Sequence, residues 1–353
     1  MKDIVIVTGC MVRGGAEGVI ATVANGLAQR GWKIHIISIL FDRWDYELDP
    51  SIECIDISNE KRNQMLDTPR LVLELRKKIR QIKPKAVLSF MVAVNIVTWL
   101  ATRRLNVKYI PSERNDPDKG RSSLIKKLQA KAYGAADTTV FQTTRAKEYF
   151  SDAIQKKSVI IPNPLREMPE AVYGASKRIV TAGRLSEQKN HKLLIDAFAG
   201  VYRDHPDYSI DIYGEGSMRD ELQAYIDEKG LRNLVHLCGK VDNVPERIQD
   251  AYMFVLPSDY EGLSNALLEA MGIGLPCITT NCAGSDDAIQ DGENGLIVPI
   301  QDRVAMEKAI RKLIEDHERA EIMGKKARES MSRYKVDNVV DQWEALVKNE
   351  SGR

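Results

Sequence analysis

Short apolar runs alternate with segments of helical periodicity along this sequence, in two successive series. This alternation predicts parallel sheets that are covered by helices on both faces. The runs of the first series lie at residues 4–8, 33–40, 86–90, 109–111, 138–142 and 159–161. Those of the second series lie at residues 179–183, 209–213, 235–237, 253–257, 276–280 and 295–298.

Pro164 and Pro169 separate the two series, because neither proline can continue a regular element. The chain of 353 residues is also too long for one compact core. We therefore predict an α/β fold of two Rossmann-like, doubly wound parallel-sheet domains, at 1–165 and 170–333, that face each other across a ligand-binding cleft. A last helical stretch, at 334–350, starts no new strand, and the sequence leaves open whether it packs back on the first domain.

The two halves carry opposite charge, although the net charge is only +1. Residues 1–165 hold 27 Lys and Arg against 17 Asp and Glu, a difference of +10, and the remaining 24 and 33 leave −9. A basic first half suggests an anionic partner such as phosphate, an acidic membrane surface or nucleic acid. Ordinary solvated helix faces are the alternative interpretation.

The 5 cysteines form no CxxC pair, which argues against a disulfide framework or a zinc site and favours a reducing compartment. Residues 1–3 lead directly into an apolar run, so we expect no secretory signal. The longest candidate membrane segment, 91–101, falls short of the roughly 20 apolar residues of a spanning helix. We expect a cytoplasmic protein that is soluble or bound peripherally to a membrane.

The clearest chemical signal follows the apolar run at 253–257. Glu261 and Gly262 lie in the next loop, and Ser264 is placed to cap a helix that carries Glu269. The amides at such a helix start, with a dipole of about half a charge, form a site for a diphosphate. Carboxylates can accept hydrogen bonds from sugar or ribose hydroxyls, whereas they would repel a phosphate. The alternative is that Glu269 is only a charge on a helix face and Ser264 only a cap.

A second signal is the segment at 183–190, which reads Gly-Arg-Leu-Ser-Glu-Gln-Lys-Asn and follows the first strand of the second series. Arg184 and Lys189 would place fixed positive charge at the carboxyl end of that strand, where they could replace a metal ion in holding a leaving diphosphate. Two exposed cations in a surface loop are the alternative.

These segments together resemble the retaining glycosyltransferases of family 4, which have the two-Rossmann GT-B architecture. The resemblance rests on Gly-Arg-Leu-x-x-Gln-Lys-Asn, followed by Glu261-Gly262 and Glu269. Supporting matches span nearly the whole chain: Gly14-Gly15-Ala16-Glu17, Asn163-Pro164, Tyr213-Gly214-Glu215-Gly216, Gly239-Lys240 and Gly292-Glu293-Asn294-Gly295-Leu296. The sequence is similar above all to bacterial enzymes of surface polysaccharide and lipid-linked glycan assembly.

The resemblance implies a role for each matching residue. Arg184 and Lys189 would bind the donor diphosphate and, with Glu261 at the transferred sugar, would form the catalytic set. Glu269 would hold the ribose hydroxyls. The other donor-binding positions are Gly14, Gly15, Gly214, Gly239, Lys240, Gly262, Leu263 and Ser264. Independently of the resemblance, Gly14 and Gly15 fit a loop whose backbone approaches a ligand closely, and an ordinary strand-to-helix turn is the alternative.

The sequence departs from the family where many members place a histidine in the first domain. Here residues 112–116 read Ser-Glu-Arg-Asn-Asp after the corresponding strand, and none of the 5 histidines lies there. Arg114 or Asn115 is our hypothesis for the residue that positions the acceptor or sugar. Asp116-Pro117-Asp118 matches an Asp-x-Asp motif, but a proline-containing loop favours turn chemistry. We therefore expect no metal and no other cofactor.

Two basic amphipathic stretches lie in the first domain, at 70–85 and 122–131. We expect the first to pack on the sheet, whereas the second fits either the sheet or an anionic membrane. The resemblance suggests an acceptor glycan on a polyprenyl diphosphate, with a soluble glycan as the other option. No recognised nucleic-acid module accompanies the basic half, so we expect no nucleic-acid partner.

The resemblance thus implies retaining, metal-independent transfer of an N-acetylhexosamine or hexose from a UDP-sugar. No carboxylate is obviously poised as a nucleophile, so we expect front-face attack in which the leaving diphosphate assists deprotonation of the acceptor. A nucleotide-sugar epimerase and a non-catalytic nucleotide-sugar-binding protein are the alternatives. A nicotinamide-dependent dehydrogenase fits less well, since residues 9–15 lack the G-x-G-x-x-G spacing.

Overall fold

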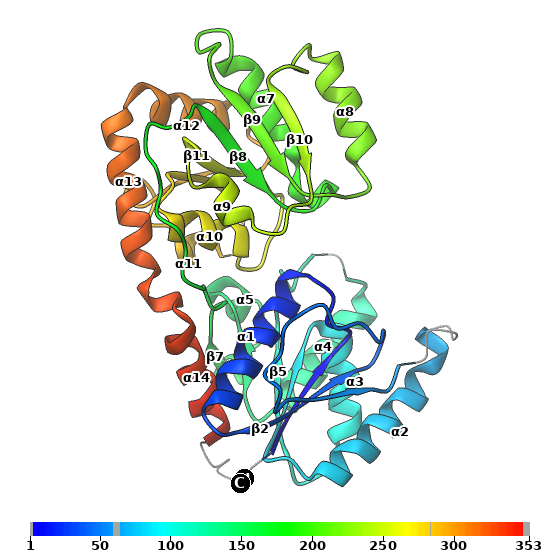
Figure 1. The fold of residues 1–353 in the computed structure, drawn as a ribbon. Helices are drawn as coiled ribbons and strands as arrows, with labels where there is room; N and C mark the ends of the chain where they lie inside the picture. The colour runs from blue at the N-terminus through cyan, green and yellow to red at the C-terminus, as the bar shows by residue number, and fades with distance from the viewer. Residues whose placement is uncertain (1–2, 59–63, 120, 283, 349–353) are drawn as a thin grey trace. The chain divides into compact units, whose positions relative to one another are not determined.

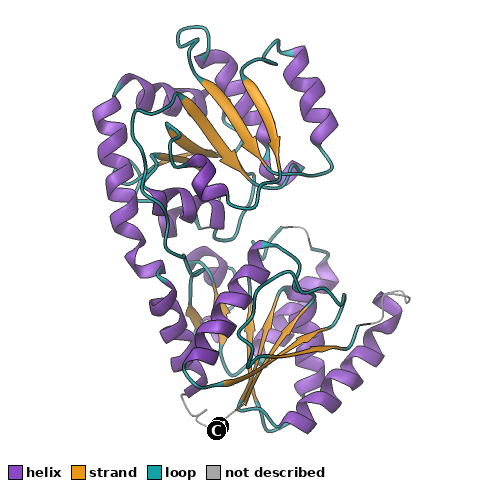
Figure 2. Ribbon diagram, in the orientation of Figure 1, coloured by secondary structure: helices purple, strands orange, loops and turns teal. Residues whose placement is uncertain are grey.

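The computed structural model describes residues 3–58, 64–119, 121–282 and 284–348. The chain divides into two compact units: unit 1 comprises Met1–Pro164 and Tyr334–Arg353, and unit 2 comprises Leu165–Arg333. Each unit is a parallel sheet flanked by helices (Figure 1; Figure 2). The predicted fold class, two doubly wound α/β domains, is confirmed. Residues 349–350 of the predicted last helix lie outside the described residues.

Unit 1 contains a sheet of seven strands in the order β3-β2-β1-β4-β5-β6-β7. Its strands are β1 (Asp3–Thr8), β2 (Lys33–Ser38), β3 (Glu53–Asp56), β4 (Ala86–Phe90), β5 (Lys108–Ser112), β6 (Thr139–Phe141) and β7 (Ser158–Ile160). Its helices are α1 (Gly15–Gln29), α2 (Gln64–Ile82), α3 (Val92–Thr102), α4 (Ser123–Gly134), α5 (Thr144–Glu148), α6 (Asp152–Gln155) and α14 (Val336–Lys348). The order runs outward from β1 and β4, so the switch point of this sheet lies between these two strands.

Both faces of the unit 1 sheet are buried, which is why its central strands read as continuous apolar runs. Ile4 and Ile6 of β1 pack with α1 and with Trp343 of α14, whereas Val5 and Val7 pack with α2 and α3. The C-terminal helix α14 thus belongs to the core of unit 1. The indole Nε1 of Trp32, just before β2, donates a hydrogen bond of 2.9 Å to Glu344 of the same helix.

Unit 2 contains a sheet of six strands in the order β10-β9-β8-β11-β12-β13. Its strands are β8 (Arg178–Ala182), β9 (Ser209–Tyr213), β10 (Val235–Gly239), β11 (Met253–Leu256), β12 (Cys277–Thr280) and β13 (Leu296–Val298). Its helices are α7 (His191–Val201), α8 (Arg219–Glu228), α9 (Val244–Ile248), α10 (Asn265–Ile273), α11 (Ser285–Ala288), α12 (Arg303–Glu315) and α13 (His317–Ser330), with short 3₁₀ turns η1 (Glu187–Lys189) and η2 (Met331–Tyr334). Here the switch point lies between β8 and β11.

The predicted apolar runs coincide with twelve of these strands, and β3 is the strand that sequence reasoning missed. The stretch predicted to pack on the sheet forms α2, with Leu71, Leu75 and Ile79 buried against the sheet. The second basic stretch forms α4. None of the helices within the described ranges combines the length and the apolarity needed to cross a lipid bilayer.

Candidate active site

The loops that follow β8 and β11 flank the switch point of unit 2, where doubly wound sheets bind ligands. The two loops are joined by hydrogen bonds. The backbone N–H of Asp259 donates to the carbonyl of Gln188 at 2.9 Å, and the Gln188 amide donates to the carbonyl of Tyr260 at 2.8 Å. Asn190 Nδ2 donates to Asp259 Oδ1 at 2.8 Å. Two segments that are distant in the sequence are thereby joined at one edge of the sheet.

Lys189 and Glu261 meet across these two loops. Lys189 Nζ lies 2.5 Å from Glu261 Oε1, and only 15% and 11% of the two side chains are exposed. Ser258 Oγ donates a second hydrogen bond to the same carboxylate oxygen at 2.9 Å. Arg184, in contrast, is exposed, and it makes no ion pair within the described part of the chain. The structure therefore brings Lys189 to Glu261 and leaves Arg184 at the surface of the same loop.

Helix α10 begins beside this pair. Ser264 is its N-cap and accepts a hydrogen bond from the backbone N–H of Leu267, as the sequence predicted. Leu263 and Ser264 are 4% and 7% exposed. The first-turn amides of a helix point along its axis and carry partial positive charge, so this end of α10 attracts an anion. Gly274 in the left-handed conformation (φ 101°) ends the helix.

Glu269 lies one turn further along α10 and is half-buried. Burial raises the pKa of its carboxyl, and Arg166 partly offsets this effect. A half-buried carboxylate is less solvated than a surface charge, and it can accept hydrogen bonds from the hydroxyl groups of a ligand. This environment fits the donor-binding role proposed for Glu269 better than that of a solvated helix charge.

Gly214 explains how the neighbouring loop approaches so closely. A Cβ on Gly214 (φ 145°) would lie 1.9 Å from the carbonyl oxygen of Gly183. The amide of Gly183 donates to the carbonyl of Tyr213 at 2.9 Å, and the amide of Gly214 donates to that of Gly239 at 2.8 Å. Backbone hydrogen bonds donated by Gly183 and Gly214 thus join the loops after β8, β9 and β10.

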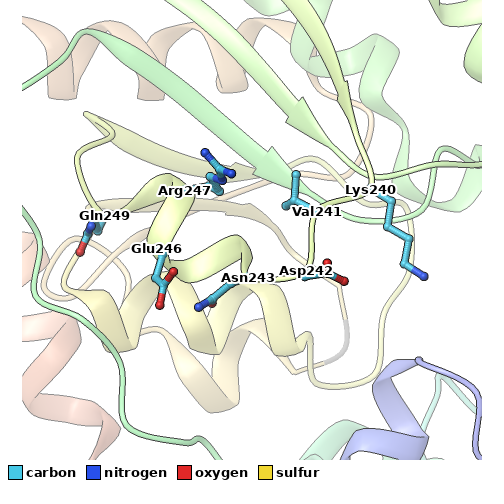
Figure 3. Close-up of a pocket in the computed structure, with 7 residues that line it drawn as sticks. All are labelled: Lys240, Val241, Asp242, Asn243, Glu246, Arg247 and Gln249. Atoms are coloured by element: carbon cyan, nitrogen blue, oxygen red, sulfur yellow. The ribbon is translucent and has the colours of Figure 1, made fainter. Parts of the chain in front are cut away.

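Gly239 and Lys240 lead into a pocket of about 620 Å³ between the loop after β10 and helix α9 (Figure 3). Gly239 adopts a positive φ of 75°, which favours glycine. The residues that line the pocket are Lys240, Val241, Asp242, Asn243, Glu246, Arg247 and Gln249. These side chains are polar apart from Val241, and the space suits a small polar ligand group.

In unit 1, Gly14 is the N-cap of α1 in an extended conformation, and Gly15 begins the helix. The Gly14 amide donates to the hydroxyl of Tyr46 at 3.0 Å, and that hydroxyl donates to the Gly14 carbonyl at 2.7 Å. The glycine loop is therefore closed by Tyr46. It lies after β1, at the switch point of the unit 1 sheet.

Arg114 lies inside unit 1 and is 7% exposed. Its guanidinium lies over the rings of Phe90 and Trp343, at 5.3 and 5.5 Å, and donates to Asn163 Oδ1 at 3.1 Å. Burial lowers the pKa of Arg114 to about 9, against the opposing effect of Glu113. This placement argues against direct sugar contact by Arg114. Asn115, which is half-buried in the same loop, is the better placed of the two candidates.

The Asp-x-Asp motif makes local contacts. Asp116 accepts a hydrogen bond from the amide of Asp118 at 2.8 Å, and Asp118 pairs with Lys126 at 2.8 Å. Among the described residues, no group of three or more His, Cys, Asp or Glu side chains converges as a metal site would require.

Sequence reasoning missed Ser258 and Glu113, which both act on residues that it had named. Ser258 bonds to Glu261, and Glu113 bonds to the backbone of Arg114 and Asn115. The signal for Ser258 was its position at the end of a buried strand, three residues before Glu261. Glu113 also follows a buried strand, but its partners on α4 are defined only by the fold, so that position alone did not reveal its role.

Two family models match the chain and together cover almost all of it. The model for Glycosyltransferase Family 4 matches residues 13–166, and the model for Glycosyl transferases group 1 matches residues 166–330. The boundary between the two matches lies at the boundary between unit 1 and unit 2.

Relatives of similar length include two Campylobacter jejuni enzymes. The N-acetylgalactosamine-N,N'-diacetylbacillosaminyl-diphospho-undecaprenol 4-alpha-N-acetylgalactosaminyltransferase is 28% identical over 86% of this chain and 87% of its own. A second alpha-1,4-N-acetyl-D-galactosaminyltransferase, which acts on a GalNAc-containing diNAcBac-PP-undecaprenol, is 22% identical over 98% of both chains. Among solved structures, Anabaena HepE in complex with UDP-glucose has the same fold, with a TM-score of 0.84, 16% identity, and 99% of this chain and 100% of that chain covered.

These matches favour sugar transfer over the epimerase and dehydrogenase alternatives, because both halves of the chain match transferase models. The fold agrees, with two parallel-sheet units of the GT-B type. The chain belongs to the GT-B glycosyltransferases, with a family 4 first half and a group 1 second half.

Proposed function

We propose that the protein transfers an N-acetylhexosamine or hexose from a UDP-sugar to a hydroxyl of a polyprenyl-diphosphate-linked glycan, with retention of anomeric configuration. The observation that carries the proposal is the Lys189–Glu261 pair beside the first turn of α10. A cation, a helix N-terminus and a carboxylate largely shielded from water are groups that can bind a nucleotide diphosphate sugar.

The donor would bind to unit 2. Its diphosphate would take Glu261's place as the partner of Lys189, with Arg184 as the second cation and the amides of Leu263 and Ser264 as donors. Glu261 would then be released to accept hydrogen bonds from the sugar. Glu269 would hold the ribose, and the base would occupy the pocket beside Lys240. The two cations would stabilise the leaving diphosphate without a metal ion.

A polyprenyl-linked acceptor is supported by the names of the two Campylobacter relatives, whose acceptors are carried on undecaprenol diphosphate. HepE was crystallised with UDP-glucose, which supports a UDP-linked donor. In a front-face reaction, the leaving diphosphate of the donor can accept the proton from the attacking hydroxyl of the acceptor. Such a reaction needs no nucleophile from the protein. The products would be UDP and an elongated glycan with the donor's anomeric configuration.

The direct test incubates the purified protein with a panel of UDP-, GDP- and TDP-sugars and a polyprenyl-diphosphate-linked disaccharide. We expect UDP release and glycan elongation with one UDP-sugar, in the presence of EDTA, and an axial product linkage from an axial donor by NMR. An inverted product would refute retention. Loss of activity with EDTA that Mg²⁺ restores would refute metal independence. Donor binding without turnover on any acceptor would favour a non-catalytic role.

We further propose that unit 1 contacts an anionic membrane, at the cytoplasmic face, through α4. Residues 119–136 contain five Lys and Arg and no Asp or Glu. The exposed face of α4 consists of Ser123, Leu124, Lys127, Ala130, Lys131 and Gly134. Leu124 is 64% exposed, and Tyr149, which lies beside Lys126, is 42% exposed. Asp118, just before this segment, pairs with Lys126, but the exposed face of α4 itself carries apolar and cationic side chains, which suit the surface of an anionic bilayer.

Vesicle flotation tests this contact. Each lysine near an anionic surface contributes about 1 kcal/mol, so K127E/K131E should weaken binding to anionic vesicles at least about tenfold. The matched control is K312E/K326E, which reverses two exposed lysines of unit 2. Equal binding of both variants would place the contact elsewhere, and absence of wild-type binding at low salt would argue for a soluble acceptor.

A further inference from the structure

The carboxylate of Glu113 lies at the carboxyl end of β5 and is 1% exposed. Its Oε1 accepts hydrogen bonds from the backbone amides of Arg114 and Asn115, at 3.0 and 3.1 Å. The same oxygen accepts from Arg121 Nη2 at 2.9 Å, and Arg121 Nη1 donates to the carbonyl of Pro117 at 3.2 Å. One carboxylate oxygen therefore closes the loop between β5 and α4 from the inside.

The other oxygen of Glu113 is anchored in the core. Its Oε2 accepts hydrogen bonds from Gln129 Nε2 and Tyr133 OH, at 2.7 and 2.9 Å, and both donors are on α4. Tyr133 in turn accepts from Asn95 Nδ2 at 3.0 Å, and Asn95 also donates to the carbonyl of Ser112 at 2.9 Å. Glu113 thus connects the loop to α4, and through Asn95 to α3.

The hydrogen bonds around Glu113 use all the acceptor positions of its carboxylate, and this limits its chemistry. A carboxylate offers about four lone-pair positions, and five donors surround this one. No lone pair remains to attack a sugar or to accept a proton from an acceptor hydroxyl. An uncompensated charge would be costly at this depth, so the network of donors is what allows a carboxylate here. The side chain holds other groups in place and does not react.

The groups held in place face the ligand-binding edge of the sheet. Asn115 and Asp116 are half-buried, and Asn115 Oδ1 accepts a hydrogen bond from the Asp116 amide at 2.8 Å. The loop follows β5, next to β4 at the switch point of unit 1. The loop occupies the position at which many related enzymes have a histidine in the first domain. This chain has no histidine there.

We infer that Glu113 is a positioning residue, which fixes the loop at 114–118 so that Asn115 is presented to the reacting sugar or acceptor. This inference rests on the proposed transferase function. A side chain held by a buried carboxylate is presented in one orientation, and misplacement by about 1 Å can cost on the order of 10²-fold in rate. Glu113 acts through Asn115 and touches no substrate.

E113Q is the principal test. The amide nitrogen of the new side chain must face donors on one side or the other, either the loop amides or Gln129 and Tyr133. We expect kcat to fall on the order of 10²-fold, with KM for the donor and the affinity for UDP unchanged. We also expect faster hydrogen exchange at the amides of Arg114 and Asn115, which can be measured without substrate.

R121Q is a milder second variant, because it removes one donor to Oε1 and leaves the carboxylate. We expect a smaller loss of kcat in the same direction. Y109F is the matched control: it removes a buried hydrogen bond of unit 1, from Tyr109 OH to the carbonyl of Asn95 at 2.7 Å, without touching Glu113. Its kcat should fall much less than that of E113Q at a similar loss of stability.

The outcomes separate the two proposals. If the wild type transfers sugar and E113Q is equally active, the role of Glu113 is refuted but the proposed function is not. Equal losses of kcat in E113Q and Y109F, or a loss expressed only in donor KM, would also refute this role, because a general loss of packing would then suffice. A wild type that neither binds UDP nor transfers sugar would refute the proposed function, and the role of Glu113 with it.

Discussion

The Lys189–Glu261 pair allows stability and function to be tested with the same variants. Removing one partner of a buried ion pair costs about 3–5 kcal/mol, because the other charge stays buried without compensation. Both side chains keep some exposure, 15% and 11%, so we expect the lower end, about 3 kcal/mol, for K189M. The hydrogen bond from Ser258 would still reach the Glu261 carboxylate, but the compensating positive charge would be lost.

The double variant K189M/E261Q removes both charges, and most of the lost stability should return. For a unit of the size of Leu165–Arg333, 1 kcal/mol corresponds to about 2–4 °C in Tm. K189M should therefore unfold about 6–12 °C below the wild type. K192M is the control, because Lys192 forms a more exposed pair with Glu221 and its loss should cost under about 1 kcal/mol.

Activity should follow a different pattern from stability. Both K189M and K189M/E261Q lack a cation for the diphosphate, so turnover should fall on the order of 10²- to 10³-fold in each. Calorimetry of unfolding and of UDP binding, with a transfer assay, gives the three quantities needed. Equal destabilisation in K189M and the double variant would refute the coupling of the two charges. Recovery of turnover along with stability in the double variant would refute diphosphate binding by Lys189.

Three further predictions concern single residues of unit 2. R184A should change stability by less than about 0.5 kcal/mol, since Arg184 is exposed, but should lower turnover on the order of 10²- to 10³-fold in the transfer assay. Because burial raises the pKa of Glu269 in the folded protein, its ionised form lowers stability at higher pH. E269Q should therefore raise Tm at about pH 7, have no effect on Tm well below pH 4.5, and weaken UDP binding by calorimetry. G214A should lower Tm by the equivalent of about 1–3 kcal/mol or more, because its Cβ would meet the Gly183 carbonyl at a positive φ.

The fold was largely predictable because central parallel strands are buried on both faces and therefore read as unbroken apolar runs. Ala86–Phe90 and Met253–Leu256 are buried throughout, and the sequence predicted both. Strand β3 carries Glu53 and Asp56, lies at the edge of its sheet and is largely exposed. An edge strand is held by backbone pairing on one side, so no apolar pattern marks it.

For the candidate site, the sequence predicted residue types but not their partners. The sequence predicted that Lys189 and Glu261 each contact the nucleotide-sugar donor. Their contact with each other depends on the pairing of β8 with β11, which the sequence did not reveal. That pairing places the ends of two strands side by side across the switch point. Because loop charges are arranged by neighbouring strands and not by neighbours in sequence, a charge can be predicted before the group that compensates it.

Arg114 shows the same limit more sharply. The sequence places it directly after a strand, in the position of a family histidine, and chemistry alone favours an arginine as a sugar or phosphate ligand. Its guanidinium instead packs against Trp343, which comes from the opposite end of the chain on α14. Only a helix that returns to unit 1 can provide this partner, and the sequence left that return open. Once Trp343 and Asn163 are in place, the arginine becomes part of the core, which leaves Asn115 as the candidate for contact with a ligand and Glu113 as the residue that we propose to hold it.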